Sequence, residues 1–596
     1  MTTADGEPVV SVTDATLADI ATHGIWRGAG FDINPSVLAV ARALLAAVQG
    51  SAPAGALPGE LQELVAGVRR RAEVTLQRVP MTEDISLSAF AIRQNAAEPR
   101  PVVIVPAGWN PYGWLPFMAG YLSLAARGYH VLAYTPRGIG KPGLVSTSEG
   151  FIDVAGPVDW ADGSKVIDHA QAQFAPGKVG FMGLSYGSGI SQLVAAHDQE
   201  GRVAAVAALS TWGNLATSLY DNGTRHEEAV RKLIEFTGGA EEEKFDERTR
   251  RILQDFRDGR NMEGVVAWGT ERSPETYVES TNARGIPTFY SNTWHESLFP
   301  AGEAIAAFDK LTTPKHLNLW IGDHGAPEGA GITGVVTGVA FPGLLTPMRE
   351  AYAWLDHHLL GDANEVPDWP VVSSQVMFTY ETAPALGGGR RITAPARREP
   401  LASWADATTG TEDWHLHGDG ALSDKPSTGW SRDFTAGHET TATAMDDIMK
   451  TGQKEWFGNP KTYDPAGFER SQLLVWSTEA LAGGRRIRGT AHLQLTVRAP
   501  EADAATLVAY LFDIAPDGSA RIITHEPFTA TGLSAGTDRT VGWKLQPTAY
   551  DLPDGHRLAL VVNSRDQLYA FTGTQDSTTT ITSPAGEEAV LELPLG

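Results

Sequence analysis

Cysteine is absent from this 596-residue sequence, which excludes disulfide bonds, a thiolate nucleophile and cysteine-ligated zinc or iron–sulfur sites. Basic residues are scarce, because 47 Lys and Arg stand against 71 Asp and Glu and give a formal net charge of −24 at pH 7. Such a surface repels nucleic acids and anionic membranes, so we expect neither as a partner. The charge carries no information about catalysis.

Long apolar runs are also missing from the sequence. The most apolar stretch, residues 37–48, is short and contains Arg42, so it cannot span a bilayer. The amino-terminal residues 1–7 lack the basic and apolar regions of a secretory signal. We therefore expect a cytoplasmic protein.

The chain is too long for one hydrophobic core, so two or three domains are expected. Its composition, 42% hydrophobic and 20% charged, is that of an ordinary globular protein. The residue pattern divides it into a helical extension over residues 1–72, an α/β domain over 73–370 and an all-β domain over 371–596. The extension could pack on the α/β domain or form a homo-oligomer contact.

Two helices are predicted in the extension. Asn34-Pro35 has the signature of a helix start, and apolar residues then recur at helical spacing up to Gly50. A second helix is predicted over residues 57–71. From Val74 the apolar period changes to two, which indicates a β-hairpin.

The α/β domain contains six short runs that are apolar on both faces and are separated by helix-length segments. This pattern indicates a parallel sheet covered by helices on both sides. The runs are residues 101–105, 129–134, 178–183, 203–209, 286–291 and 315–322.

The alternation stops over residues 212–285, which are polar and helix-prone. In an α/β-hydrolase fold this is the place where a cap over the active site is inserted. After Gly361 helical periodicity fades, and short alternating segments bounded by Gly, Pro and Asp indicate a β-sandwich.

Residues 178–190 are typical of a nucleophile elbow, in which a buried strand turns sharply into a helix at a serine flanked by glycines. This makes Ser185 the predicted nucleophile. A second G-x-S-x-G motif, residues 532–536, follows no apolar strand and precedes no helical pattern, so we expect a surface turn there.

An elbow serine needs a histidine base and a carboxylate that orients it. In α/β-hydrolases these follow the serine in the order acid, then histidine, at the ends of later strands. His324 directly follows the run 315–322 and Glu296 follows the run 286–291, so they are the predicted base and acid. Asp323 is expected to stabilise the loop. A zinc site of His295, His324 and His357 has no supporting ligand spacing, and we expect no metal or cofactor.

The oxyanion hole requires two donors. The backbone N–H of Tyr186 is expected to be one, and the second is expected from the loop 106–114, as either a backbone N–H or the phenol of Tyr112. Four tryptophans near the predicted site could line a substrate pocket or belong to the core; they are Trp109, Trp114, Trp212 and Trp294.

Residues 80–596 resemble the cocaine-esterase and X-prolyl dipeptidyl-peptidase family of serine hydrolases. The resemblance rests on motifs that occur in the family's order. They are Asn110-Pro111-Tyr112, Thr135-Pro136-Arg137-Gly138, Ser148-Glu149-Gly150, Gly183-Leu184-Ser185-Tyr186, Trp294-His295-Glu296, His324, residues 354–361, and 476–481 and 511–518 in the β domain.

The resemblance implies an α/β-hydrolase domain with a helical cap and a carboxy-terminal jelly roll. It also implies a triad of Ser185, Glu296 and His324, with the hydroxyl of Tyr112 in the oxyanion hole. The sequence departs from the family in its Glu acid, in the position of the second elbow glycine and in a longer loop before Pro111.

We therefore expect a serine hydrolase that cleaves an ester or amide of a small molecule through an acyl-enzyme. The alternatives are an X-prolyl dipeptidyl-peptidase, an acyltransferase and, from another class, a noncatalytic binding protein. An exopeptidase needs carboxylates that capture a free α-ammonium, and the sequence offers no dedicated acidic anchor for it.

Overall fold

The computed structural model describes residues 35–596 except 54, 335–341, 386–388 and 500–502. Helices α2 (Pro35–Gln49) and α3 (Gly59–Arg71) confirm the two helices predicted before the first strand, and both pack on α4 (Met118–Ala126). Residues 1–34 of the predicted extension lie outside the described residues.

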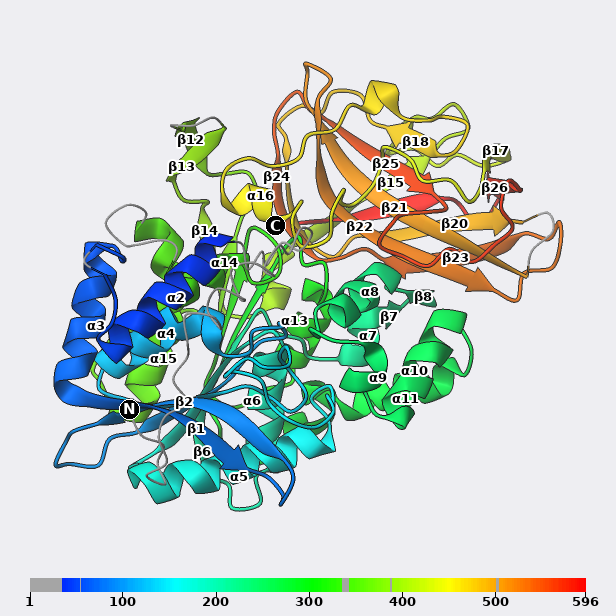
Figure 1. Ribbon diagram of the computed structural model, residues 1–596. Helices are drawn as coiled ribbons and strands as arrows, with labels where there is room; N and C mark the ends of the chain where they lie inside the picture. Colours follow the sequence, from blue (N-terminus) through cyan, green and yellow to red (C-terminus); the bar gives the residue numbers. More distant parts are fainter. Residues whose placement is uncertain (1–34, 54, 335–341, 386–388, 500–502) are drawn as a thin grey trace.

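A ten-stranded mixed sheet forms the centre of the α/β domain, with the order β1-β2-β4-β3-β5-β6-β9-β10-β11-β14 (Figure 1). The strands from β4 to β11 are parallel, and β1, β2 and β14 pair antiparallel at the two edges. Their bounds are Ala72–Pro80 (β1), Ser86–Gln94 (β2), Val102–Pro106 (β3), His130–Tyr134 (β4), Val179–Leu184 (β5), Val203–Leu209 (β6), Thr288–Thr293 (β9), Lys315–Trp320 (β10), Val372–Gln375 (β11) and Arg398–Leu401 (β14). All six predicted runs are strands of this sheet, and β11 and β14 extend it beyond residue 370.

The central strands are apolar on both faces because each face has its own core. In β3, Val102 and Ile104 face one core, whereas Val103 and Val105 face the other. This alternation follows from the two-residue period of a strand, and it explains why the runs show no polar face.

Helices cover both faces of the sheet. On one side, α5 (Pro157–Phe174), α12 (Val278–Arg284) and α6 (Tyr186–His197) pack together over β5 and β6, and α13 (Ala301–Asp309) packs on β9. On the other side, α4, α14 (Ala326–Thr333) and α15 (Thr346–Leu355) pack with α2 and α3; α15 continues into a π-helical turn, η4 (Asp356–Leu360). None of the helices in the described ranges is long and apolar enough to cross a membrane.

The predicted cap is present between β6 and β9 as a group of helices. They are α7 (Leu215–Leu219), α8 (Glu227–Glu235), α9 (Glu241–Lys244), α10 (Glu247–Asp258) and α11 (Met262–Glu271), with a small hairpin of β7 (Tyr220–Asp221) and β8 (Thr224–Arg225). Three cap side chains, Val230, Phe256 and Val265, form a small apolar cluster of their own.

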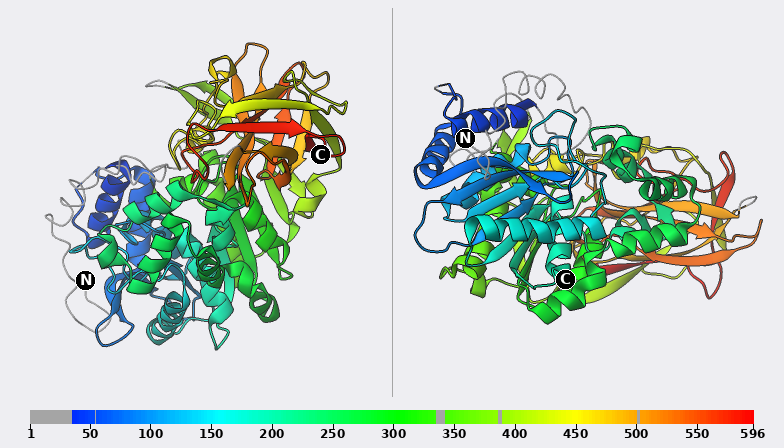
Figure 2. Two further views of the ribbon diagram at one scale, coloured as in Figure 1. Left: turned by 90° about the vertical axis from the view of Figure 1, so that its right-hand side faces the viewer. Right: turned by 60° about the horizontal axis from the view of Figure 1, so that its bottom comes forward.

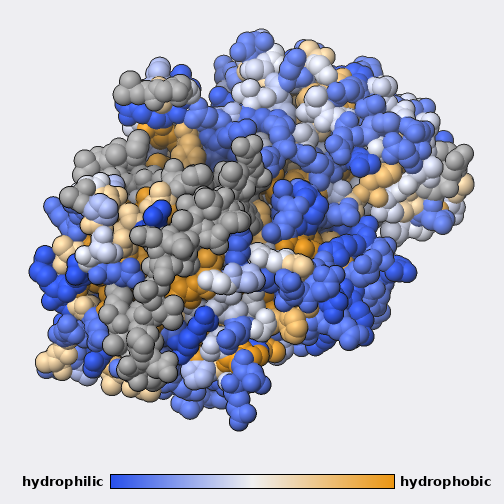
Figure 3. Space-filling view, viewed as in Figure 1, coloured by the Kyte–Doolittle hydropathy of each residue, from blue (hydrophilic) through white to orange (hydrophobic). Residues whose placement is uncertain are grey.

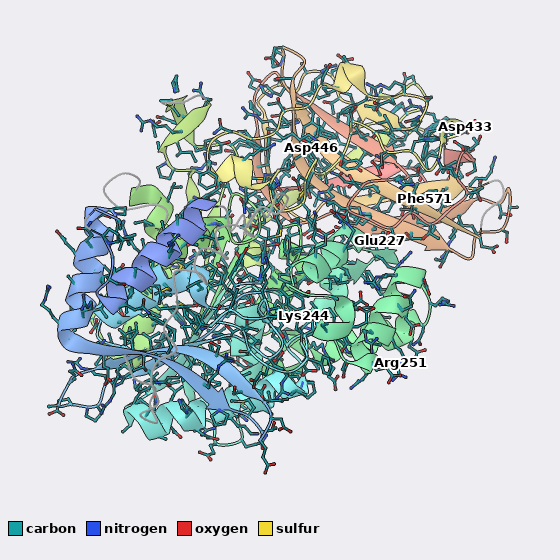
Figure 4. The ribbon with its side chains drawn as sticks, viewed as in Figure 1. Glu227, Lys244, Arg251, Asp433, Asp446 and Phe571 are labelled. Carbon is teal, nitrogen blue, oxygen red and sulfur yellow. The ribbon has the colours of Figure 1, made fainter. Side chains whose placement is uncertain are left out.

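The cap is fastened at both ends. Buried Lys244 donates to the carbonyl oxygens of Gly138 (2.9 Å) and Gly140, so α9 is tied to the catalytic domain. At the other end, the Thr529 N–H donates to the Asn222 carbonyl oxygen at 2.9 Å, which ties the cap hairpin to the β domain. Figure 4 shows Lys244 where the cap meets the catalytic domain, and Arg251 at the outer edge of the cap.

The carboxy-terminal domain is a sandwich of two antiparallel sheets that lies beside the catalytic domain, with the cap at their junction (Figure 2). One sheet is β18-β25-β21-β22, and the other contains β15, β16, β17, β19, β20, β23, β24, β26 and β27. The bounds are Gly410–Leu416 (β15), Leu422–Ser423 (β16), Trp430–Thr435 (β17), Leu474–Ser477 (β18), Arg485–Gly489 (β19), His492–Arg498 (β20), Ala504–Ile514 (β21), Ala520–Thr531 (β22), Arg539–Lys544 (β23), Thr548–Leu552 (β24), Arg557–Asn563 (β25), Thr578–Ser583 (β26) and Val590–Leu595 (β27).

Short elements complete the structure. A hairpin of β12 (Glu381–Pro384) and β13 (Arg390–Ala394) lies between β11 and β14, and α16 (Gln453–Trp456) lies between β17 and β18. The 3-10 turns are Leu115–Phe117, Pro274–Tyr277, Pro342–Leu345, Val366–Asp368, Trp404–Ala407 and Pro465–Gly467. The second G-x-S-x-G motif is the turn between β22 and β23, as predicted.

Candidate active site

Ser185 stands at the junction of β5 and α6 with φ 57° and ψ −121°, a backbone conformation that side chains rarely adopt. The turn is possible because the residues two positions before and after Ser185 are glycines. A Cβ on Gly183 would lie 2.0 Å from the Gly187 carbonyl oxygen, and one on Gly187 would lie 2.1 Å from that of Pro106. The elbow predicted from the sequence is therefore confirmed in its backbone geometry.

The structure brings Ser185, His324 and Glu296 together from the ends of β5, β10 and β9. His324 Nε2 lies 2.7 Å from Ser185 Oγ. On the other side of the ring, His324 Nδ1 lies 2.9 and 3.0 Å from the two carboxylate oxygens of Glu296. All three residues are buried. One imidazole thus joins the hydroxyl to the carboxylate, with each ring nitrogen in hydrogen-bonding contact.

The two acidic residues beside His324 have different partners. Glu296 Oε1 also accepts hydrogen bonds from the backbone N–H groups of Leu298 (3.0 Å) and Phe299 (3.3 Å). Asp323 Oδ1 accepts from the N–H and the hydroxyl of Ser297 and from the N–H of His324, at 2.7–2.9 Å. Asp323 therefore holds the two turns together, which confirms its predicted role in the loop.

A third buried carboxylate, Glu328, supports the histidine turn from α14. It accepts hydrogen bonds from the hydroxyls of Ser210 (3.0 Å) and Ser291. The hydroxyl of Ser210 in turn accepts the N–H of Gly325 at 2.9 Å, next to His324. Glu328 thus fixes the backbone immediately after the imidazole, although it does not touch the ring nitrogens through any hydrogen bond between described residues.

Burial and charge oppose each other at the imidazole. Burial favours the neutral ring, but the negative charge and hydrogen bond of Glu296, together with the charges of Asp323 and Glu328, outweigh it and raise the pKa of His324 above its usual 6.5. Burial, reinforced by the charge of Glu296, raises the pKa of Asp323 to about 7. Burial also raises the pKa of Glu328. The site therefore stabilises an imidazolium, the form that a histidine base takes when it removes a proton from a serine hydroxyl.

Tyr186, which follows Ser185, supplies the first N–H of α6, and the first N–H groups of a helix have no intrahelical acceptor. Its phenol points elsewhere, because it donates to the carboxylate of buried Asp159 at 2.6 Å. Tyr186 can therefore contribute a backbone donor beside Ser185, but its hydroxyl is already engaged.

Two cavities reach Ser185. The first, named here the cap cavity, runs from Ser185 under the cap and is lined by side chains of α7, α8, α10 and α11. The second, named here the histidine-side cavity, is lined by Ser185, His324, the loop Gly108–Asn110, Leu298 and Met449 of the β domain. On the face of the molecule shown in Figure 3, the surface of the cap and of the β domain is mostly hydrophilic, whereas the side chains that line the cap cavity are mostly apolar.

Comparison with known families gives two matches that follow the two domains. Residues 83–326 match the family model described as X-Pro dipeptidyl-peptidase (S15 family), and residues 364–590 match that of the X-Pro dipeptidyl-peptidase C-terminal non-catalytic domain. The chain belongs to this family of serine hydrolases. No curated protein sequence matches it.

Solved structures share the fold of this hydrolase at low sequence identity. An α-amino acid ester hydrolase is similar at 16% identity and a TM-score of 0.66, over 88% of this chain and 97% of the other. An aminopeptidase from a marine sediment Thaumarchaeota archaeon is similar at 15% identity and a TM-score of 0.65, over 88% and 96%. A CocE/NonD family hydrolase from Staphylococcus aureus is similar at 12% identity and a TM-score of 0.63, over 88% and 94%.

The structure does not place Tyr112 in either cavity of the hydrolase. Tyr112 is fully buried, and the ammonium of Lys141 lies 5.3 Å from the centre of its ring. The loop after β3 is long, so the residues that face Ser185 are Gly108, Trp109 and Asn110, ahead of Tyr112. Tyr112 thus lines neither cavity, and the loop residues that share a cavity with Ser185 are those that could offer the other predicted option, a backbone N–H.

Of the predicted pocket tryptophans, Trp109 lines both cavities and Trp212 lines the cap cavity. Trp294 lines neither; its indole N–H donates to the Gln375 carbonyl oxygen at 2.7 Å, and its ring packs on Trp404. Trp114 is also a core residue, fully buried in the second core cluster. Trp294 and Trp114 are therefore structural residues, because both rings pack against other side chains inside the protein and line neither cavity.

Three residues of the site were not among those predicted from the sequence. Phe299 lies edge-on to His324, with 5.2 Å between ring centres, and lines the cap cavity. Met449 comes from a long segment of the β domain, and Glu328 comes from the helix after the histidine turn. Only Glu328 was within reach of sequence reasoning, as an acid four residues after the predicted base.

Proposed function

We propose that this serine hydrolase cleaves an ester of a small molecule through an acyl-enzyme on Ser185. His324 takes the proton of Ser185 Oγ as the oxygen attacks the carbonyl carbon, and Glu296 stabilises the resulting imidazolium. His324 then gives this proton to the leaving alcohol as the carbon–oxygen bond breaks. Water attacks the acyl-enzyme by the same route and releases the acid. The observation that carries the proposal is the continuous contact from Glu296 through His324 to Ser185.

The oxyanion of the tetrahedral intermediate would be held by two backbone N–H groups. One is that of Tyr186, and the other belongs to the loop Gly108–Asn110. The close approach of this loop to the elbow supports the second assignment, since a Cβ on Gly108 would lie 3.1 Å from the Leu184 carbonyl oxygen.

A dipeptidyl-peptidase is the second candidate, because both family models carry that description. Such an enzyme has to hold the free α-ammonium of its substrate with carboxylates. Among the described residues, those that line the two cavities include no Asp or Glu. The carboxylates of Glu296 and Asp159 are engaged by His324 and Tyr186. This favours an ester with an uncharged acyl group over an X-Pro peptide.

The test compares p-nitrophenyl acetate with Ala-Pro and Gly-Pro p-nitroanilides, for the wild type and for His324→Ala. We expect turnover of the ester, loss of that turnover in the variant and little release of p-nitroaniline. Efficient cleavage of the anilides would contradict the proposed ester hydrolase and support a dipeptidyl-peptidase. Assays with added alcohols or amines measure transfer of the acyl group to these acceptors. If the acylated acceptor forms in larger amounts than the free acid, the protein is an acyltransferase.

A further inference from the structure

The two cavities at Ser185 differ in their relation to the base. The histidine-side cavity includes His324 in its lining, whereas the cap cavity includes Ser185 but not His324. His324 Nε2 is the atom that has to protonate the leaving oxygen, so the leaving group must depart on its side. The acyl group, the other substituent of the carbonyl carbon, then extends into the cap cavity.

The walls of the cap cavity are mainly hydrocarbon, and two of the three indole N–H groups in its lining are already paired. The indole N–H of Trp109 donates to the Leu233 carbonyl oxygen (2.7 Å), and that of Trp212 donates to the Arg272 carbonyl oxygen (3.2 Å). The third, that of Trp268, is buried without a hydrogen-bond partner among the described residues. One indole donor does not replace a hydration shell, so a charged or strongly polar acyl group would lose more there than it gains.

The cavity continues beyond the catalytic domain into the cap. Its far lining includes Val230 of α8, Phe256 of α10 and Val265 of α11, the three buried members of the apolar cluster of the cap. The cavity has a volume of about 100 Å³, against roughly 10–15 Å³ needed for one water molecule. An apolar space of this kind, open at the nucleophile and walled by helices, suits a chain of methylene groups.

We propose that the cap cavity holds the alkyl chain of the acyl group, so that the substrates are esters of straight-chain aliphatic carboxylic acids with a small alcohol. The alcohol lies in the histidine-side cavity, next to Met449. This inference rests on the proposed ester hydrolysis by Ser185. Each methylene that enters the cap cavity is expected to raise kcat/KM roughly fourfold.

Two isomeric esters separate the two cavities. Ethyl octanoate places the long chain on the acyl side, and octyl acetate places the same number of carbon atoms on the alcohol side. We expect the wild type to hydrolyse ethyl octanoate with at least a tenfold higher kcat/KM than octyl acetate. A preference for octyl acetate would overturn the inference while leaving the proposed ester hydrolysis standing.

The second part of the experiment uses variants in which a larger side chain fills the end of the cap cavity formed by the cap helices. Val265→Trp is expected to lower the ratio of kcat/KM for ethyl octanoate to that for ethyl acetate by at least tenfold. Val230→Phe, on a different helix, is expected to do the same with a smaller change in volume. Val158→Trp is the matched control, because Val158 is an exposed residue of α5 outside the cavity.

The outcomes are distinguishable. If both cavity variants fold, as judged by their thermal unfolding, and leave the ratio at the wild-type value, the chain does not enter the cap. If the wild type hydrolyses none of these esters and no p-nitrophenyl acetate, the proposed function fails and the inference fails with it. A ratio that falls in both cavity variants and not in Val158→Trp supports the inference.

Discussion

The two walls that meet at Ser185 are built from opposite kinds of side chain. The floor, at the carboxyl ends of β5, β9 and β10, buries three carboxylates, those of Glu296, Asp323 and Glu328, and each accepts at least two hydrogen bonds. The roof, formed by the cap, presents apolar side chains.

This difference separates two tasks. Buried polar groups are costly unless they are paired, so a floor of this kind has one arrangement and holds catalytic atoms in a fixed geometry. Apolar contacts are not directional, and a wall made of them selects substrates by volume. We therefore expect changes in the floor to act on the rate, and changes in the roof to act on substrate preference and stability.

The largest effect is expected at the nucleophile. Ser185→Ala removes the attacking oxygen, and kcat/KM for p-nitrophenyl acetate should fall by roughly 10⁴-fold or more. The matched control is Ser534→Ala, which removes the serine of the exposed second G-x-S-x-G turn and should keep wild-type activity. Near-normal turnover by Ser185→Ala would show that Ser185 is not the nucleophile and that the floor is not the catalytic site.

The next effect is expected at the acid. Glu296→Gln removes the charge that stabilises the imidazolium, and kcat should fall by roughly 10³- to 10⁴-fold. His324 has to be neutral to act as base, so activity in the wild type is lost as pH falls through its raised pKa. The variant lacks the charge that raises this pKa, and the acid limb of its pH profile should move to lower pH. If the acid limb of the pH profile does not move, a group other than His324 determines it.

Substitutions of Glu328 test whether this buried carboxylate affects kcat only by positioning the imidazole of His324. Glu328→Leu removes the acceptor for Ser210 and Ser291 and frees the turn after His324. We expect kcat to fall by up to roughly 10²-fold with a small change in KM, because the imidazole is misplaced by a fraction of an ångström. Glu328→Gln should recover part of the activity. Equal losses in both variants would point to a role for the charge itself.

The smallest effect on turnover is expected in the roof. Phe256→Ala empties space in the apolar cluster of the cap and should lower the free energy of unfolding by about 3 kcal/mol. Hydrolysis of ethyl acetate should change much less than in Glu328→Leu. The measurements are thermal unfolding and kcat for the short ester. A loss of kcat as large as that of Glu328→Leu would break the division between floor and roof.

The sheet and the contact of Ser185 and Glu296 with His324 were predictable from the sequence for one physical reason. Parallel strands buried on both faces give unbroken apolar runs, and catalytic side chains follow such runs at one edge of the sheet. The run before Ser185 and the runs before Glu296 and His324 therefore located all three residues, and the glycines at 183 and 187 located the turn.

The rest of the site depends on packing between segments that are distant in the sequence. Tyr112 was predicted from a motif, but the length of the loop after β3 decides which of its residues faces Ser185. Trp294 follows a core strand as a pocket residue would, yet its ring packs on Trp404. The cap lining and Met449 reach the site only through docking of the cap and the β domain, which no local pattern encodes.

The most direct test of the central claim is to label the protein with a fluorophosphonate and locate the adduct by mass spectrometry. An activated serine reacts covalently with such a probe, whereas an ordinary serine does not. We predict a single adduct on Ser185 that is absent from His324→Ala. An adduct on another serine, or undiminished labelling of Ser185 without His324, would contradict the account.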